Sequence, residues 1–307
     1  MSLEKRELYR LPWSKNDNPI AWLEITDICN LHCEGCYRQR LTGHKPLDEI
    51  KEEILFFKRW RNPDNVSIAG GEPLVHPQIV DIVAFIAENG LKPIVLTNAA
   101  MLTPELLREL KAAGLGSLPG GGAEVFAQRV RDQVCPSKIS ADEWLGVHKT
   151  AHRCGLPTNA TMLYGHVETV EERVDHLIRL REAQDETGGF QAFIPLSFHP
   201  ANTRLSHLPG PTGVEDLTVI AASRLLLDNF AHIKAYWIML GFKLAQTALY
   251  FGADDLDGTV VEEVITRMAG GVTDGEVPVD ELVQEVKAAG LVPVERDTFY
   301  ETVRVYE

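Results

Sequence analysis

Residues 20–37 read IAWLEITDICNLHCEGCY, a short strand-like run followed by a loop with three cysteines. The apolar run Ile20–Ile25 is typical of a β-strand. Cys29, Cys33 and Cys36 follow with the spacing C-x3-C-x2-C, which places three thiols on one compact loop. The chain has five cysteines, an odd number, so a metal or reactive site is favoured over a disulfide framework.

Outward from this stretch, short apolar runs alternate with runs of helical periodicity. Strands are expected at Ile20–Ile25, Val66–Ala69, Pro93–Thr97, Leu115–Leu118, Asn159–Leu163, Gln191–Pro195, Ile233–Trp237 and Leu291–Val294. Helices are expected at Pro46–Phe57, Pro77–Ala87, Thr103–Ala113 with Thr103 as N-cap, Thr169–Glu186, Val214–Asn229, Phe242–Phe251, Val260–Met268 and Val279–Ala289. Repeated βα units imply a parallel sheet with right-handed crossovers. The sequence therefore predicts an α/β fold, a full or partial TIM-like (βα) barrel over residues 1–270, with a small C-terminal extension at 271–307 packed on it.

Composition narrows the class of protein. The 307 residues are 45% hydrophobic, and 44 acidic against 30 basic side chains give a net charge of −14. An acidic surface repels phosphate backbones and anionic lipids, so nucleic acid and membranes are poor partners. No apolar run approaches the ~20 residues of a membrane span, and the N-terminus resembles no export signal. We expect a cytoplasmic protein.

The cysteine loop offers a specific kind of metal chemistry. Thiolates are the ligands of iron–sulfur clusters, and three of them leave one iron of a cubane cluster open to a small molecule. A structural zinc site needs a fourth ligand, which His32 could supply. Other polar motifs also follow expected strands, notably Gly70–Pro73 and Thr97-Asn98. Since the strand ends of a parallel barrel share one face, these motifs are expected near the cysteines.

On these residues the chain resembles the radical S-adenosylmethionine superfamily, in which an aromatic residue such as Tyr37 follows the cysteines. The resemblance implies a 4Fe-4S cluster held by Cys29, Cys33 and Cys36, and S-adenosylmethionine bound to its open iron. It implies that the reduced cluster cleaves the sulfonium to methionine and a 5′-deoxyadenosyl radical. The residues implied in binding S-adenosylmethionine are Tyr37, Gly70, Gly71, Glu72, Pro73, Asn98 and Glu124. For Gly70–Pro73 an ordinary strand-to-helix turn, and for Thr97-Asn98 simple strand termination, are the alternatives.

From about residue 118 onward the chain resembles a narrower family, the aminofutalosine synthases of menaquinone biosynthesis. The matching segments are LPGGGAEVF (118–126), KISADEWLGVHKTAH (138–152), NATMLYGHVET (159–169), ETGGFQAFIPLSFHPANT (186–203), AYWIMLG (235–241) and FGADDLDGTVVEE (251–263). The resemblance implies a transferase whose adenosyl radical adds to 3-[(1-carboxyvinyl)oxy]benzoate to give aminodeoxyfutalosine. It also implies a small-molecule substrate and an electron donor such as flavodoxin or ferredoxin.

Residues 1–117 resemble a different radical S-adenosylmethionine branch. The context NLHCEGCYRQR and the following GGEPL depart from the synthase wording SGCKFCAF. The chain therefore reads as a composite with a seam near residues 111–118, and a natural or a constructed join are both open. Two alternatives remain: a radical enzyme whose substrate is set by the N-terminal half, or a folded iron–sulfur protein without this activity.

Several polar residues after later strands are candidates for substrate binding. They are Tyr164, His166, His199, Asn202 and Arg204, with loop capping or ordinary surface positions as the alternative reading. Trp237 and Met239 suit packing or a pocket wall. The motif at Asp254–Asp257 suits capping and turns better than a cation loop. Two further groups, Cys135 with Cys154 and the helix pair His148 with His152, are expected to be structural.

Overall fold

The computed structural model describes residues 20–31, 43–60, 63–258, 266, 269–271 and 277–307. Its contacts divide the chain into two compact units. Unit 1 comprises Met1–Gly122 and Arg131–Thr158, and unit 2 comprises Ala123–Val130 and Asn159–Glu307. The expected division near residue 270 is a different one and stays a prediction.

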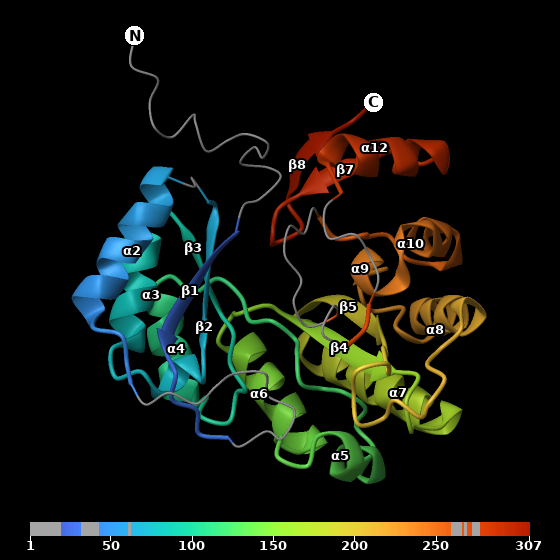
Figure 1. The fold of residues 1–307 in the computed structure, drawn as a ribbon, viewed down its shortest axis with the longest axis horizontal. Coiled ribbons are helices and arrows are strands. Elements are labelled where there is room, and N and C mark those ends of the chain that lie inside the picture. The colour runs from blue at the N-terminus through green and yellow to red at the C-terminus, as the bar shows by residue number, and fades with distance from the viewer. Residues whose placement is uncertain (1–19, 32–42, 61–62, 259–265, 267–268, 272–276) are drawn as a thin grey trace. The chain divides into compact units, whose positions relative to one another are not determined.

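Unit 1 is built on a three-stranded parallel sheet in the order β1-β2-β3. Its strands are β1 (Ile20–Thr26), β2 (Asn65–Gly70) and β3 (Lys92–Val95). Helices α2 (Leu47–Trp60), α3 (Ile79–Glu88) and α4 (Pro104–Ala112) lie along one face of that sheet (Figure 1). The remaining elements in this stretch of chain are the 3-10 helix η1 (Pro73–Val75), α5 (Gln128–Val134) and α6 (Ala141–Arg153).

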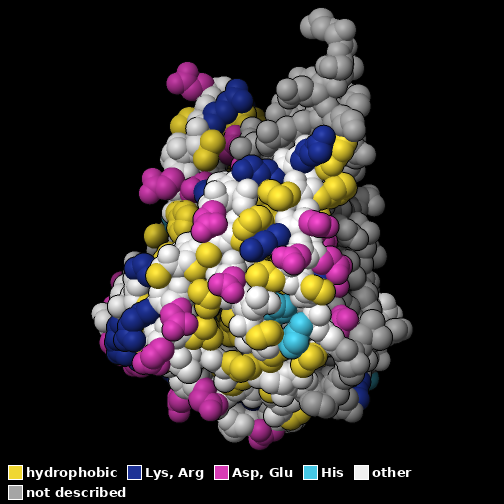
Figure 2. Space-filling view, turned by 90° about the vertical axis from the view of Figure 1, so that its left-hand side faces the viewer, with side chains coloured by type: hydrophobic (Ala, Val, Ile, Leu, Met, Phe, Trp, Pro, Cys, Tyr) yellow, Lys and Arg dark blue, Asp and Glu magenta, His cyan; other side chains and the backbone are white. Residues whose placement is uncertain are grey.

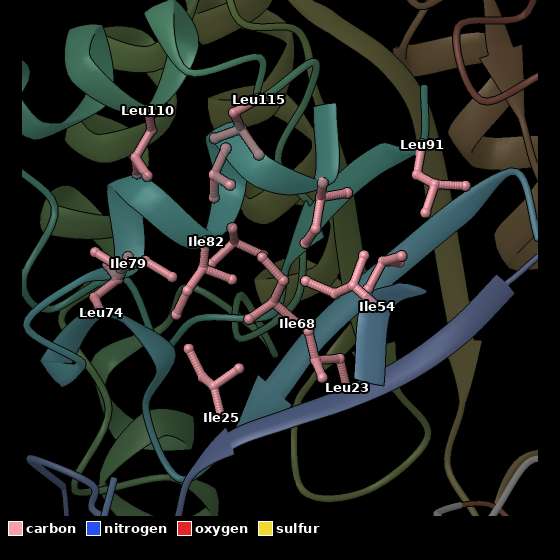
Figure 3. Packing of buried hydrophobic residues seen from close by; sticks show 14 of the residues in the cluster. Leu23, Ile25, Ile54, Ile68, Leu74, Ile79, Ile82, Leu91, Leu110 and Leu115 are labelled. Carbon is pink, nitrogen blue, oxygen red and sulfur yellow. The ribbon is translucent and has the colours of Figure 1, made fainter. Parts of the chain in front are cut away.

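The helix-covered face carries the core of unit 1. Along β1, Ala21, Leu23 and Ile25 are fully buried, while Trp22, between Ala21 and Leu23, is 47% exposed. This alternation follows from the period of two in a strand, which sends successive side chains to opposite faces. Leu23 and Ile25 lie in one cluster with Ile54 of α2 and Ile82 of α3 (Figure 3). Burying a side chain of this size contributes about 1.5–3 kcal/mol, so this cluster is what holds the helices against the sheet.

Side-chain caps determine where several helices begin. Thr103 Oγ1 accepts from Leu106 N at 3.2 Å, which confirms it as the N-cap of α4. Ser140 before α6 forms a full capping box with Glu143, in which each side chain satisfies the other residue's backbone N–H. Such caps stabilise a helix by about 1 kcal/mol because they satisfy otherwise orphaned donors.

Unit 2 holds a second three-stranded sheet in the order β4-β5-β6. Its strands are β4 (Thr158–Tyr164), β5 (Phe190–Ser197) and β6 (His232–Ile233), and β5 and β6 pair in parallel. The helices of this part of the chain are α7 (Val170–Thr187), α8 (Gly213–Leu226), α9 (Trp237–Leu240), α10 (Phe242–Ala248), η2 (Leu249–Phe251) and α12 (Val279–Ala288). The C-terminal segment ends in an antiparallel hairpin of β7 (Val294–Arg296) and β8 (Thr302–Val305). The βα alternation expected over the chain is confirmed in both units.

Three expected strands differ in the structure. The strand expected at Ile233–Trp237 ends at Ile233, and Trp237 begins α9 with its indole N–H donating to Gly258 O at 3.0 Å. The strand expected at Leu115–Leu118 is reduced to one bridge between Leu118 and Thr158. The strand expected at Leu291–Val294 begins only at Val294. Short apolar runs do not distinguish strand from buried helix or loop, which explains these errors. The helix expected at Val260–Met268 lies largely outside the described residues.

The surface over α2 mixes charge and apolar groups. Figure 2 shows acidic, basic and hydrophobic side chains interspersed on this side of the molecule. Leu55 and Phe56 of α2 are 46% and 55% exposed. Among the described residues, no helix combines the length and the apolar character needed to cross a bilayer.

Candidate functional site

The Gly-Gly-Glu-Pro turn that follows β2 is tied to the start of the cysteine loop by the backbone. Gly71 N donates to Thr26 O at 2.7 Å, and Glu72 N donates to Ile28 O at 2.8 Å. Gly70 has a φ of 131°, and a Cβ on Gly70 or Gly71 would collide with Thr26 O or Ile28 O. These two glycines therefore allow the end of β2 to lie against the end of β1.

Glu72 is a buried hydrogen-bond acceptor at the centre of this turn. Its side chain is 1% exposed. Oε1 accepts from Thr97 Oγ1 at 2.6 Å and from Leu74 N at 3.0 Å. Oε2 accepts from Asn98 N at 2.7 Å. Glu72 thus joins the ends of β2 and β3, because a buried carboxylate requires such donors.

Asn98 connects this carboxylate to the first cysteine. Its Nδ2 donates to Asn30 Oδ1 at 2.7 Å and lies 3.8 Å from Cys29 Sγ. Its Oδ1 accepts from Ala100 N at 3.0 Å, and Ala99 has a left-handed φ of 64°. The turn after β3 is thereby held so that the Asn98 amide N–H group points at the thiol.

The thiol of Cys29 also receives Leu31 N at 3.5 Å. The same sulfur lies 3.9 Å from Asn30 Oδ1. Cysteine sulfur is the ligand of iron–sulfur clusters. This donor set fits a thiolate-ligated cluster. Cys33, Cys36 and Tyr37 lie outside the described residues. Within the described part of the chain, no three His, Cys, Asp or Glu side chains gather as a metal site.

Two expected substrate residues lie at the end of β4 and are enclosed by protein. Tyr164 is fully buried and donates to Asp216 Oδ1 at 2.6 Å, and Ser197 Oγ donates to the same oxygen at 2.9 Å. Burial is the largest cause of the raised pKa of both Tyr164 and Asp216. His166 Nε2 contacts Leu163 O at 2.9 Å, and its Nδ1 lies 2.7 Å from Val167 N and 2.8 Å from a carboxylate oxygen of Glu168.

An ion-pair network lies directly beyond His166. Glu168 is enclosed and pairs with Arg173 Nε at 2.7 Å, and Arg173 also reaches Glu215 at 2.6 Å. Burial opposes ionisation of Glu168, but hydrogen bonds from His166 and from the Gly165 backbone overcome it and lower its pKa. The network holds the start of α7 and the start of α8 to the loop after β4.

The other expected substrate residues lie on the loop after β5, and Glu124, expected to bind S-adenosylmethionine, lies elsewhere in unit 2. His199 Nε2 contacts Met239 O at 3.0 Å. Asn202 and Arg204 are exposed on the same loop. Glu124 belongs to unit 2, has a φ of 48° and accepts from Leu163 N through its carbonyl at 3.1 Å. The roles proposed for these side chains stay predictions.

The motif Asp254–Asp257 makes ion pairs and a turn. Asp255 accepts from Arg296 at 2.5 Å and from Tyr300 at 2.6 Å, and Lys234 lies 3.7 Å away. These partners overcome burial and lower the pKa of Asp255. Asp255 Oδ1 also accepts from Asp257 N at 2.8 Å, the turn contact that was expected. The ion pairs were not expected, since Lys234 precedes Asp255 by 21 positions and Arg296 follows it by 41.

Sequence reasoning missed Asn30 and Asp216. Asn30 lies beside Cys29, and adjacency to a ligand was the available signal. Asp216 lies in the regular periodicity of α8, and nothing in its neighbourhood distinguished it from a solvated acid. Only the meeting of β4, β5 and α8 makes it an acceptor for Tyr164 and Ser197.

Comparison with known proteins gives two family matches. Residues 23–180 match the radical SAM superfamily, and residues 187–307 match the CofH/MqnC C-terminal region. Among solved structures, methylornithine synthase aligns with a TM-score of 0.64 at 17% identity, covering 95% of this chain and 87% of that one. The hydrogenase maturase HydG from Carboxydothermus hydrogenoformans aligns with a TM-score of 0.64 at 14% identity, covering 96% and 72%. These two structures show the fold.

Curated relatives carry two different names. Aminodeoxyfutalosine synthase from Thermus thermophilus is 42% identical, over 92% of this chain and 82% of that protein. The synthase of Streptomyces coelicolor is 38% identical, over 93% and 81%. The 5-amino-6-(D-ribitylamino)uracil–L-tyrosine 4-hydroxyphenyl transferase of Archaeoglobus fulgidus is 38% identical, over 91% and 85%.

Proposed function

Since the chain belongs to the radical SAM superfamily, whose members are S-adenosylmethionine-dependent enzymes, we propose that it is an aminodeoxyfutalosine synthase. Its substrate would be 3-[(1-carboxyvinyl)oxy]benzoate, to which the adenosyl radical adds, with loss of the carboxylate as bicarbonate or carbon dioxide. The observation that carries this proposal is the 42% identity to the Thermus thermophilus synthase over most of both chains.

Cys29, Cys33 and Cys36 would hold the 4Fe-4S cluster. When bound, the cluster supplies the single electron that splits S-adenosylmethionine into methionine and a 5′-deoxyadenosyl radical. Gly70, Gly71, Glu72, Pro73 and Asn98, together with Tyr37 and Glu124, are the residues proposed to surround S-adenosylmethionine.

Contacts within the protein hold the residues of the proposed S-adenosylmethionine site in place. Glu72 accepts from Thr97 Oγ1 and from Asn98 N, and so holds both residues in place. The backbone of the Gly70–Pro73 turn is fixed against Thr26 and Ile28. Such preorganisation matters because a misplacement of about 1 Å can cost about a hundredfold in rate.

The substrate and the electron donor would meet other residues of the chain. Tyr164, His166, His199, Asn202 and Arg204 remain the residues proposed for the substrate, and of these Asn202 and Arg204 are exposed. Arg204 suits a carboxylate because its guanidinium can donate two parallel hydrogen bonds. We propose a flavodoxin or ferredoxin as reductant and the cytoplasm as location.

A second candidate function follows from the other group of relatives. The 4-hydroxyphenyl transferases reach 38% identity over 91% of this chain, close to the values for the synthases. This activity would be one form of the alternative stated from the sequence, a radical enzyme that acts on a different substrate. It differs chemically because its acceptor substrate is a neutral ribitylaminouracil, whereas the synthase substrate is a dicarboxylate.

One experiment separates the two. The cluster is reconstituted without oxygen, and the enzyme receives dithionite and S-adenosylmethionine with either the enol-ether benzoate or the ribitylaminouracil and tyrosine. Mass spectrometry is expected to detect aminodeoxyfutalosine in the first reaction. Release of 5′-deoxyadenosine without that adduct would remove the synthase assignment and leave the superfamily chemistry.

The metal ligands are tested by single replacements. Cys29→Ser, Cys33→Ser and Cys36→Ser are each expected to lower iron content and abolish cleavage of S-adenosylmethionine, because serine is a poor ligand for iron–sulfur clusters. Cys154→Ser is the matched control, since Cys154 follows α6 and lies outside the motif. Full activity in the three variants, or zinc in place of iron, would contradict the cluster.

A further inference from the structure

The amide of Asn98 is directed at the sulfur of Cys29. Nδ2 lies 3.8 Å from Sγ, within the range of an N–H···S hydrogen bond, although the two residues are 69 positions apart. The orientation of the Asn98 side chain is fixed, because both its nitrogen and its oxygen form hydrogen bonds. Its Nδ2 also donates to Asn30 Oδ1 at 2.7 Å, and its Oδ1 accepts from Ala100 N at 3.0 Å.

A relay of hydrogen bonds fixes the backbone that carries this amide. Glu72 Oε2 accepts from Asn98 N at 2.7 Å, and Glu72 Oε1 holds the neighbouring Thr97 hydroxyl at 2.6 Å. The left-handed φ of 64° at Ala99, rare for a residue with a Cβ, keeps the turn closed after Asn98. The Gly-Gly-Glu-Pro turn is therefore connected to the cysteine loop through the Asn98 side chain.

Hydrogen bonds to cluster sulfurs are one of the means by which a protein sets a cluster's reduction potential. An N–H donor stabilises negative charge on the thiolate. The reduced cluster carries one more negative charge than the oxidised cluster, so the donor stabilises the reduced form more. A donor at this position raises the reduction potential and makes the cluster easier to reduce.

We propose that Asn98, oriented by Asn30 and Glu72, is a positioning residue that tunes the cluster's reduction potential through an N–H···S contact with Cys29. The proposal rests on the cluster part of the proposed function and is independent of which substrate the enzyme uses. It adds an electronic role to a residue that the sequence assigned to S-adenosylmethionine binding.

The test is the midpoint potential of the reconstituted cluster, followed by electron paramagnetic resonance during a redox titration without S-adenosylmethionine. Asn98→Ala is expected to shift the potential to more negative values. Loss of one such hydrogen bond corresponds to at most about a tenfold change in the reduction equilibrium, or about 59 mV for a one-electron couple. Asn98→Asp is expected to shift it further, since a carboxylate repels the thiolate. Iron and sulfide content per chain must match the wild type.

Two further variants separate this effect from general damage. Asn30→Ala leaves Asn98 in place but removes both its orienting partner and the amide oxygen that lies 3.9 Å from Cys29 Sγ. Since loss of that oxygen offsets part of the effect, a negative shift smaller than that of Asn98→Ala is expected. Asn89→Ala, at the end of α3, removes an amide that donates to Phe85 O and is expected to leave the potential unchanged. Should Asn98→Ala fail to take up the cluster, Asn30→Ala decides.

Failure of this proposal and failure of the proposed function give different results. A wild-type protein that binds no iron would remove the cluster itself. A full cluster whose potential is unchanged in Asn98→Ala and Asn30→Ala, or shifted to more positive values, would overturn the proposal while leaving the cluster intact.

Discussion

At the scale of single residues, Glu72 gives the Gly-Gly-Glu-Pro motif a structural role. The resemblance implied that Glu72 helps to bind S-adenosylmethionine. In the structure the carboxylate is 1% exposed and accepts from Thr97, Leu74 and Asn98. Glu72 thus holds the backbone of Asn98 in place, and its role in binding S-adenosylmethionine stays a prediction.

Replacing Glu72 by glutamine tests this role. The new amide would direct an N–H group at Asn98 N–H, leaving two buried donors face to face. The free energy of unfolding is expected to fall by about 1–3 kcal/mol, measured by urea titration. Glu52→Gln on the exposed face of α2 is the control. Equal stability of the two variants would show that the Glu72 contacts contribute little.

At the scale of elements, the turn after β2 depends on the absence of a side chain. Gly71→Ala would drive a Cβ into Ile28 O, so the hydrogen bonds of Gly71 and Glu72 to the end of β1 cannot both survive. A loss of more than about 2 kcal/mol is expected. Gly146→Ala in α6, where a Cβ meets nothing within 4 Å, is the matched control and should be neutral or stabilising. Thermal unfolding of both proteins checks the difference.

The C-terminal hairpin is attached to the strand ends of unit 2 by Asp255. Its carboxylate binds Arg296 of β7 and the Tyr300 hydroxyl. Asp255→Asn leaves Arg296 and Lys234 without that counter-charge, and breaking a buried pair costs about 3–5 kcal/mol. Faster amide hydrogen exchange across β7 and β8 is expected. Glu301→Gln, exposed in the same hairpin, is the control. Unchanged exchange in Asp255→Asn would mean that other contacts hold the hairpin.

At the scale of the whole molecule, stability is linked to pH through two histidines of unit 1. His148 Nδ1 and His152 Nε2 lie 2.7 Å and 2.9 Å from Thr158 Oγ1. Burial lowers the pKa of His148 to about 3 and that of His152 to about 4. Both are neutral when folded, whereas the unfolded chain binds protons near pH 6.5. Their stabilising contribution is therefore present above about pH 6.5 and is lost as the pH falls towards 4.

For His148, which is fully buried, the loss between pH 7 and pH 5 is about 2 kcal/mol. We expect the urea midpoint of the wild type to fall over this range and His148→Gln to lose part of that dependence. His207→Gln, on an exposed loop, should keep the wild-type slope. Parallel curves for wild type and His148→Gln would refute the linkage.

The organisation of the entire chain agrees with the expected radical SAM core, while its expected seam stays a prediction. The two family matches meet between residues 180 and 187, not at 111–118. The match to the Thermus thermophilus synthase extends over 92% of the chain, and so includes most of the segment before the seam. A composite origin is not needed to explain the two compact units.

Local sequence patterns were enough to predict the order of helices and strands and to identify the cysteine motif. Strand and helix periods repeat within a few residues, and the ligand spacing C-x3-C-x2-C is contained in one loop. The partners of Glu72, Asn98 and Asp255 could not be obtained that way. The long-range partners Thr97 of Glu72, Arg296 of Asp255 and Cys29 of Asn98 lie 25, 41 and 69 positions away. A polar side chain has the same local signature whether water or such a distant group satisfies it. Only the packing of strands and helices selects between these, because burial makes a hydrogen-bond partner obligatory.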